Sequence, residues 1–170
     1  AGAGRSGDSL RTVMTHADVY TVSVFREHVR INPASADAWF NLGKALADAG
    51  AFAGAVLAYR RSVELGPGDA SVHFNLGNTL RRAGDMEAAI AAYRTAITWD
   101  ANNAVIHLNL GSALDDAGDL DGAVGAYMEA LRCDPRSARA FNNLGNVYDK
   151  RGQHARAEEA YRSALRLQPD

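Results

Sequence analysis

The chain has almost no cysteine and no excess of basic residues. Its 170 residues include one cysteine and four prolines. One cysteine cannot form an internal disulfide, so a disulfide-stapled fold is excluded. The net charge is −2 and the pI is near 6.2, which leaves no basic excess to neutralise the phosphates of a nucleic acid. We therefore expect no nucleic-acid partner.

Long apolar runs are also absent from the sequence. No stretch approaches the roughly 20 apolar residues that a helix needs to span a bilayer, and the first residues lack the apolar core of a signal peptide. We therefore expect no membrane insertion and a cytoplasmic location. Because the chain starts at Ala1 without a methionine and ends at Asp170 on a repeat boundary, we expect a piece of a longer protein.

The first residues carry no apolar periodicity. Residues 1–14 are mostly small or charged, and we expect a mobile leader there. Gly2, Gly4 and Gly7 have the G-x-G-x-x-G spacing of a dinucleotide site. Such a site follows a strand and begins a helix, and no strand can precede residue 2, so this interpretation is disfavoured. We expect no cofactor.

The strongest pattern is a tripeptide that recurs every 34 residues. Asn-Leu-Gly begins at Asn41, Asn75, Asn109 and Asn143. A fixed period of this size is typical of solenoids, in which each repeat buries its apolar face by stacking on its neighbours. The predicted repeats are residues 36–69, 70–103, 104–137 and 138–170.

Each repeat is predicted to be a pair of helices. In the first repeat, Trp39, Leu42 and Leu46 are spaced for one face of a helix, and Val56 and Tyr59 belong to a second such face. A glycine interrupts each pair, at Gly50, Gly84, Gly118 and Gly152. The sequence therefore predicts an all-α fold of four helical hairpins.

Small residues recur at one position of each helix. Gly43 and its equivalents on the first helices, and Ala55 and its equivalents on the second, are expected to let the two backbones approach closely. A bulky residue there is expected to splay the hairpin. Tyr59 and its equivalents carry a large apolar area together with a hydroxyl group that needs a hydrogen-bond partner.

Residues 15–33 are predicted to form one further helix. Val22, Phe25 and Val29 have helical spacing. In the 34-residue frame Phe25 occupies the position of Tyr59, which belongs to the second helix of a hairpin. We interpret this segment as a degenerate half-repeat that caps the N-terminal end of the array.

The pattern formed by Trp39, Leu42, Ala55 and Tyr59 resembles the tetratricopeptide repeat (TPR). The resemblance covers residues 36–170. It implies a right-handed α-α superhelix that serves as a scaffold for protein-protein interaction. The Asn-Leu-Gly rows are also similar to the repeat arrays of O-linked N-acetylglucosamine transferases, in which an asparagine ladder holds substrate peptides.

The binding face is predicted to be the side of each first helix that points away from its second helix. In a solenoid this side lines the extended concave surface. A carboxamide both donates and accepts hydrogen bonds, so a row of asparagines can hold the backbone of an extended peptide. Helices roughly 10 Å apart match about three residues of extended chain. The predicted peptide-binding residues are Asn41, Lys44, Asn75, Asn78, Arg82, Asn109, Ser112, Asn143, Asn146 and Lys150.

A competing interpretation is that the asparagines only pair with backbone or solvent on a polar face. Phe40, Phe74 and Leu108 flank the row, where they either form pockets for peptide side chains or pack between repeats. The face carries both signs of charge, which disfavours a partner of one sign, such as an acidic chaperone tail.

No catalytic or metal-binding constellation is visible in the sequence, so we expect that the chain is not an enzyme. His73 and His107 occupy the position of Trp39, so we interpret them as core residues. One repeat apart, they would lie roughly 10 Å from each other, too far to share a metal bound at about 2 Å. Cys133 occupies the position of Leu65 and is interpreted as a small apolar residue.

Three functions are compatible with these patterns. The leading hypothesis is a scaffold that binds an extended peptide of a protein partner. A second is weak self-association through the ends of the array, because Leu165 and Leu167 have no following repeat to cover them. A third is the substrate-binding domain of a larger enzyme such as a glycosyltransferase.

Overall fold

The computed structural model describes residues 15–66 and 68–167, and over these ranges it consists of helices and short connections without strands. The expected leader at residues 1–14 lies outside the described residues. The helices are α1 (His16–Ile31), α2 (Ala36–Asp48), α3 (Phe52–Leu65), α4 (Ala70–Ala83), α5 (Met86–Trp99), α6 (Ala104–Asp116), α7 (Leu120–Cys133), α8 (Ala138–Lys150) and α9 (His154–Leu167). The predicted all-α fold, four hairpins preceded by one helix, is confirmed.

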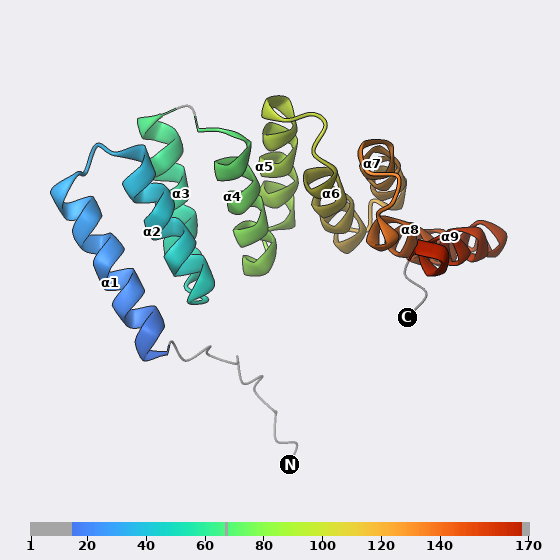
Figure 1. Ribbon diagram of the computed structural model, residues 1–170, viewed down its shortest axis with the longest axis horizontal. Helices are drawn as coiled ribbons and strands as arrows, with labels where there is room; N and C mark the ends of the chain where they lie inside the picture. Colours follow the sequence, from blue (N-terminus) through green and yellow to red (C-terminus); the bar gives the residue numbers. More distant parts are fainter. Residues whose placement is uncertain (1–14, 67, 168–170) are drawn as a thin grey trace, which may run out of the picture.

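The helices form a curved row in chain order (Figure 1). Within each hairpin the first helix packs on the second, and each second helix packs on the first helix of the next hairpin. First helices of successive hairpins also touch, α2 with α4, α4 with α6 and α6 with α8, whereas the described second helices do not touch one another. The first helices therefore lie closer together and form the inner, concave side of the row.

Helix α1 stacks on α2 as the second helix of a preceding hairpin would. Val22 and Val29 are buried against it. Thr15 and Asp18 form a capping box, in which the Asp18 backbone N–H donates to the Thr15 hydroxyl and the Thr15 backbone N–H donates to the Asp18 carboxylate. The local sequence thus fixes where this helix begins.

One tyrosine lies at the centre of each hairpin. Tyr59, Tyr93 and Tyr127, on the second helices, are at most 1% exposed. Each ring lies against the glycine of the Asn-Leu-Gly tripeptide on the first helix. A Cβ atom at Gly111 would lie 2.6 Å from Cε1 of Tyr127, which is too close for two carbon atoms. The recurring glycines therefore make room for a tyrosine ring.

Burial changes the ionisation of these tyrosines and makes stability depend on alkaline pH. Removal from water raises the pKa of Tyr93 to about 12 and also raises the pKa values of Tyr59 and Tyr127. Because an unfolded tyrosine ionises near pH 10, the folded chain retains protons that the unfolded chain releases above that pH. We expect the free energy of unfolding to fall as pH rises from about 10 through about 12.

Urea unfolding at a series of pH values checks this expectation. The urea midpoint should decrease across the alkaline range, and the decrease should be smaller in Tyr93→Phe, which removes one of the contributing groups. A midpoint that stays constant from about pH 9 to about pH 12 would contradict the link between burial and tyrosine ionisation.

None of the helices in the described part of the chain is both long enough and apolar enough to cross a membrane.

Candidate functional site

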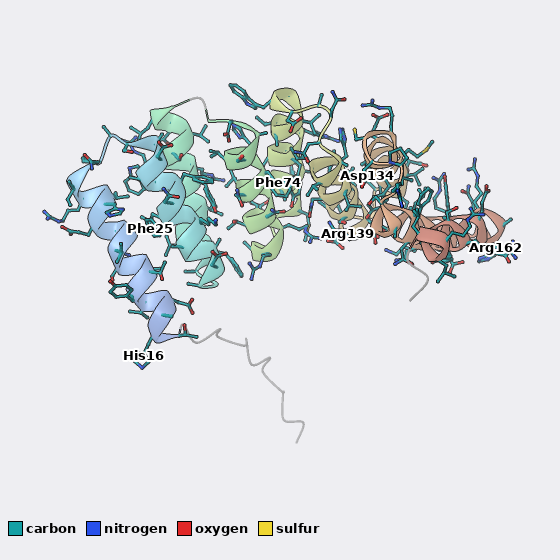
Figure 2. The ribbon with its side chains drawn as sticks, in the orientation of Figure 1. His16, Phe25, Phe74, Asp134, Arg139 and Arg162 are labelled. Carbon is teal, nitrogen blue, oxygen red and sulfur yellow. The ribbon has the colours of Figure 1, made fainter. Side chains whose placement is uncertain are left out.

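The predicted site residues all lie on the first helices, so the structure gathers them along the inner side of the row. The four asparagines of the tripeptide are half-buried, as are Asn78 and Ser112. Lys44, Arg82 and Lys150 are exposed. Figure 2 shows side chains along the whole row, with Phe74 near its middle and Arg139 towards its C-terminal end. The site is therefore an extended surface with one set of side chains from each hairpin.

The central asparagines are oriented by their own helices. The side-chain N–H of Asn75 donates to the Ser71 carbonyl at 2.8 Å, and that of Asn109 donates to the Val105 carbonyl at 2.7 Å. This is the backbone pairing that the competing interpretation expects. It uses one of the two amide N–H groups and leaves the side-chain oxygen and the second N–H without a bond in the described structure. Each carboxamide thus keeps one acceptor group and one donor.

A second polar row lies one turn further along the first helices, and in the last three hairpins the central tyrosine of the hairpin bonds to it. The Tyr93 hydroxyl donates to Oδ1 of Asn78 at 2.7 Å, and the Tyr161 hydroxyl of the last hairpin donates to Oδ1 of Asn146 at 2.7 Å. Ser112 takes this place in the third hairpin, where it accepts from Tyr127 at 3.2 Å. With their oxygens occupied, Asn78 and Asn146 present N–H donors. On α4, the free acceptor and donor of Asn75 are therefore followed one turn later by the N–H donors of Asn78.

Charged residues of the inner helices link neighbouring hairpins. The Lys150 ammonium lies 2.6 Å from an oxygen of Asp115. Arg81 pairs with Asp116 at 3.0 Å, again between successive first helices. The Arg82 guanidinium lies 4.6 Å from the centre of the Phe52 ring, a favourable cation-π arrangement. Two of the predicted peptide contacts, Arg82 and Lys150, thus already have partners within the protein.

Cavities open between successive first helices at the positions of the flanking aromatic residues. One of about 440 Å³ is lined by Phe40, and one of about 320 Å³ is lined by Phe74 and Asn75. At the next junction the equivalent residue, Leu108, is only 5% exposed and belongs to the core. Phe40 and Phe74 therefore line cavities while they also pack on the core, and Leu108 packs within the core.

The two histidines at the position of Trp39 differ in burial. His107 is 7% exposed, and its Nε2 lies 2.9 Å from the Ala101 carbonyl of the preceding loop. Trp39 donates its ring N–H to the Pro33 carbonyl at 2.9 Å in the same place of the first repeat. The interpretation as a core residue is confirmed for His107, whereas His73 is only half-buried. In the part of the chain that the structure describes, no three His, Cys, Asp or Glu side chains gather to hold a metal ion.

Comparison with known proteins agrees with this architecture. The crystal structure of MamA is 24% identical, with a TM-score of 0.84 over 87% of this chain and 86% of that one. MamA 41-end from Desulfovibrio magneticus RS-1 is 19% identical, with a TM-score of 0.85 over 91% and 87%. YrrB, described as a TPR protein with an unusual peptide-binding site, is 20% identical, with a TM-score of 0.80 over 91% and 79%. These likenesses show the fold.

Family models identify the repeats themselves. No curated protein sequence matches the chain significantly. A model described as "Tetratricopeptide repeat" matches residues 22–70 and 108–170, and one described as "TPR repeat" matches residues 77–116. The first model alone covers more than half of the chain. The chain therefore belongs to the tetratricopeptide repeat family.

Proposed function

We propose that the chain is a protein-interaction scaffold that binds an extended peptide segment of a partner along its concave side. The observation that carries this proposal is the row of half-buried asparagines, one on each inner helix. In Asn75 and Asn109 the side-chain oxygen is available, and Asn78 offers N–H groups one turn away. An extended peptide presents carbonyl and N–H groups that can pair with these donors and acceptors.

The spacing of the repeats supports the same ligand. Successive inner helices roughly 10 Å apart match about three residues of extended chain at roughly 3.3 Å each. Every third residue of an extended peptide can therefore lie beside an asparagine, and the groove need not recognise the side chain at every peptide position. Membership of the tetratricopeptide repeat family and the peptide-binding site in the printed description of YrrB are consistent with this proposal.

The double substitution Asn75→Ala with Asn109→Ala tests the asparagine row. Losing two hydrogen bonds of roughly 1 kcal/mol each is expected to weaken peptide binding about thirtyfold. The melting temperature should not decrease, because both side chains bond only to their own helices. The probe is a peptide selected against the intact chain from a random decapeptide library, and its affinity is measured by isothermal titration calorimetry.

A matched control is Asn102→Ala, an exposed asparagine in the connection between α5 and α6. Its removal should leave peptide affinity unchanged. If the double variant also binds with the affinity of the unaltered chain, the asparagines do not hold the peptide.

Self-association is a second candidate, favoured by apolar side chains at the two ends of the described array. Tyr20 on α1 is 71% exposed and Leu165 on α9 is 63% exposed. Light scattering over a concentration series separates the two functions, because a chain that stays monomeric while binding peptide acts as a scaffold alone. A substrate-binding role within a larger enzyme would use the same groove, with the substrate protein as the peptide partner.

A further inference from the structure

Three cavities occupy equivalent places along the groove. The first is lined by residues of α2, α3 and α4 and their connection, and the second by residues of α4, α6 and the connection before α6. The third, of about 580 Å³, is lined by α8 and α9 alone. Each cavity is lined by a residue from the first turn of an inner helix: Asp37 in the first cavity, Ser71 in the second and Arg139 in the third. These positions are separated by multiples of the 34-residue repeat.

The charge of the lining changes sign from the first cavity to the third. Asp37 and Asp69 line the first, which has no basic residue. Asp100 is the charged residue of the second lining, and one of its oxygens accepts a hydrogen bond from Asn103 at 2.9 Å. Arg139 lines the third, which has no carboxylate. The cavity linings thus change from acidic at α2 to basic at α8.

The charges at the two ends are available to a ligand. Asp37 and Arg139 are both exposed. Neither takes part in an ion pair within residues 15–66 and 68–167. This distinguishes them from Lys150 and Arg81, whose charges are matched by aspartates of α6. Among the helix residues that line the three cavities, only Asp37 and Arg139 are charged, so a side chain that enters a cavity meets unmatched helix charge in the first and the third.

The middle of the groove favours an apolar side chain. Phe74 and Ile106 line the second cavity. Val105 lines it too and is 51% exposed, at the position that Asp37 and Arg139 occupy in their repeats. An apolar side chain of the peptide that covers the exposed Val105 and the half-buried Phe74 ring would remove apolar surface from water, which favours binding.

We propose that the groove selects an extended peptide by the order of its side chains, basic in the first cavity, apolar in the second and acidic in the third. This inference rests on the proposed function. Because the first two cavities are one repeat apart and the third lies two repeats further on, the basic and apolar residues are about three positions apart and the acidic residue about six beyond. Complementary charge fixes the register of the bound peptide.

Two synthetic decapeptides of identical composition test the order. One carries lysine three positions before phenylalanine and glutamate six positions after it, and the other has lysine and glutamate exchanged, with alanine and serine elsewhere. Reversing the chain direction of one peptide does not convert it into the other, because the phenylalanine is off-centre. The first peptide is expected to bind about tenfold more tightly at low salt, and less so at high salt. Equal affinities would overturn the proposed order.

A charge exchange in the protein should reverse the preference. In Asp37→Arg with Arg139→Asp the net charge is unchanged and both positions are exposed, so the fold should persist, as circular dichroism can verify. The matched control is Arg61→Glu with Glu64→Arg, which exchanges an exposed ion pair on the outer helix α3. The control should retain the original preference, and an unreversed preference in the groove variant contradicts the proposal.

A third decapeptide, with alanine in place of both lysine and glutamate, separates this inference from the proposed function. If it binds as tightly as both charged peptides, the groove binds peptides but does not read charge order. If none of the three peptides binds, the order is wrong and the proposed peptide-binding function loses its support as well.

Discussion

Replacing Tyr93 with alanine is expected to lower the free energy of unfolding by about 4 kcal/mol. The Tyr93 side chain is fully buried, its ring lies against Gly77, and its ring centre is 6.1 Å from that of Phe74. Truncation removes these contacts and leaves a cavity between two helices whose other contacts hold them apart. Urea unfolding followed by circular dichroism measures the loss.

The matched control for this substitution is Tyr93→Phe. It keeps the ring and removes only the hydroxyl group that donates to Asn78 at 2.7 Å, so a loss of about 1 kcal/mol is expected. Equal losses for the alanine and phenylalanine variants would show that the hydrogen bond, and not the packed ring, stabilises the hairpin.

Two glycine-to-alanine substitutions in the hairpin formed by α6 and α7 are expected to change stability in opposite directions. At Gly111 the added Cβ atom meets the ring of Tyr127 at 2.6 Å, and that ring is 1% exposed and cannot move aside freely. Gly111→Ala should therefore lower the free energy of unfolding by about 2 kcal/mol. At Gly125, in α7, no atom lies within 4 Å of the added Cβ atom. Gly125→Ala should raise stability by up to about 1 kcal/mol through helix propensity.

Thermal unfolding of the two variants measures this contrast, with the unaltered chain as the reference. A decrease in both would mean that α7 is constrained at Gly125 by contacts absent from the structure. An increase in both would mean that the Tyr127 ring is free to leave its place against Gly111, and the glycine would then have no packing role.

The positions of the helices could be predicted because the same signals recur with each repeat. Helical spacing of apolar residues is ambiguous in one short segment, but four copies at a fixed period remove the ambiguity. The glycine breaks also have a local cause: Gly84 ends α4 with a φ of 89°, a left-handed conformation that favours glycine. The helices and their order therefore follow from local properties of the chain.

The contacts between side chains could be predicted only in part. The recurring glycines indicated a close approach of two helices, but the pattern pointed to alanine as the facing residue, whereas a tyrosine ring fills the space. The sequence also indicated that the tyrosine hydroxyl needs a partner. The constant offset of 15 residues between Asn78 and Tyr93, repeated at Asn146 and Tyr161, is a signal that could have identified it.

Contacts between repeats explain why some predicted site residues differ in the structure from what the sequence indicated. A helical wheel treats each helix alone and therefore places Arg82 and Lys150 on the groove as free charges. In the structure both have partners in a neighbouring hairpin, the Phe52 ring and the Asp115 carboxylate. Which groove charges remain available to a ligand depends on how successive hairpins stack, and one helix does not contain that information.

The most direct measurement follows the asparagine side-chain amides by NMR while an isotope-labelled chain is titrated with a library-selected peptide. Binding along the concave side predicts that the amide signals of the central row shift together, with one dissociation constant, while those of Asn32 and Asn102, outside the groove, stay in place. The signals of the row belong to Asn41, Asn75, Asn109 and Asn143. A peptide that binds and leaves these four signals unchanged would contradict the proposed groove.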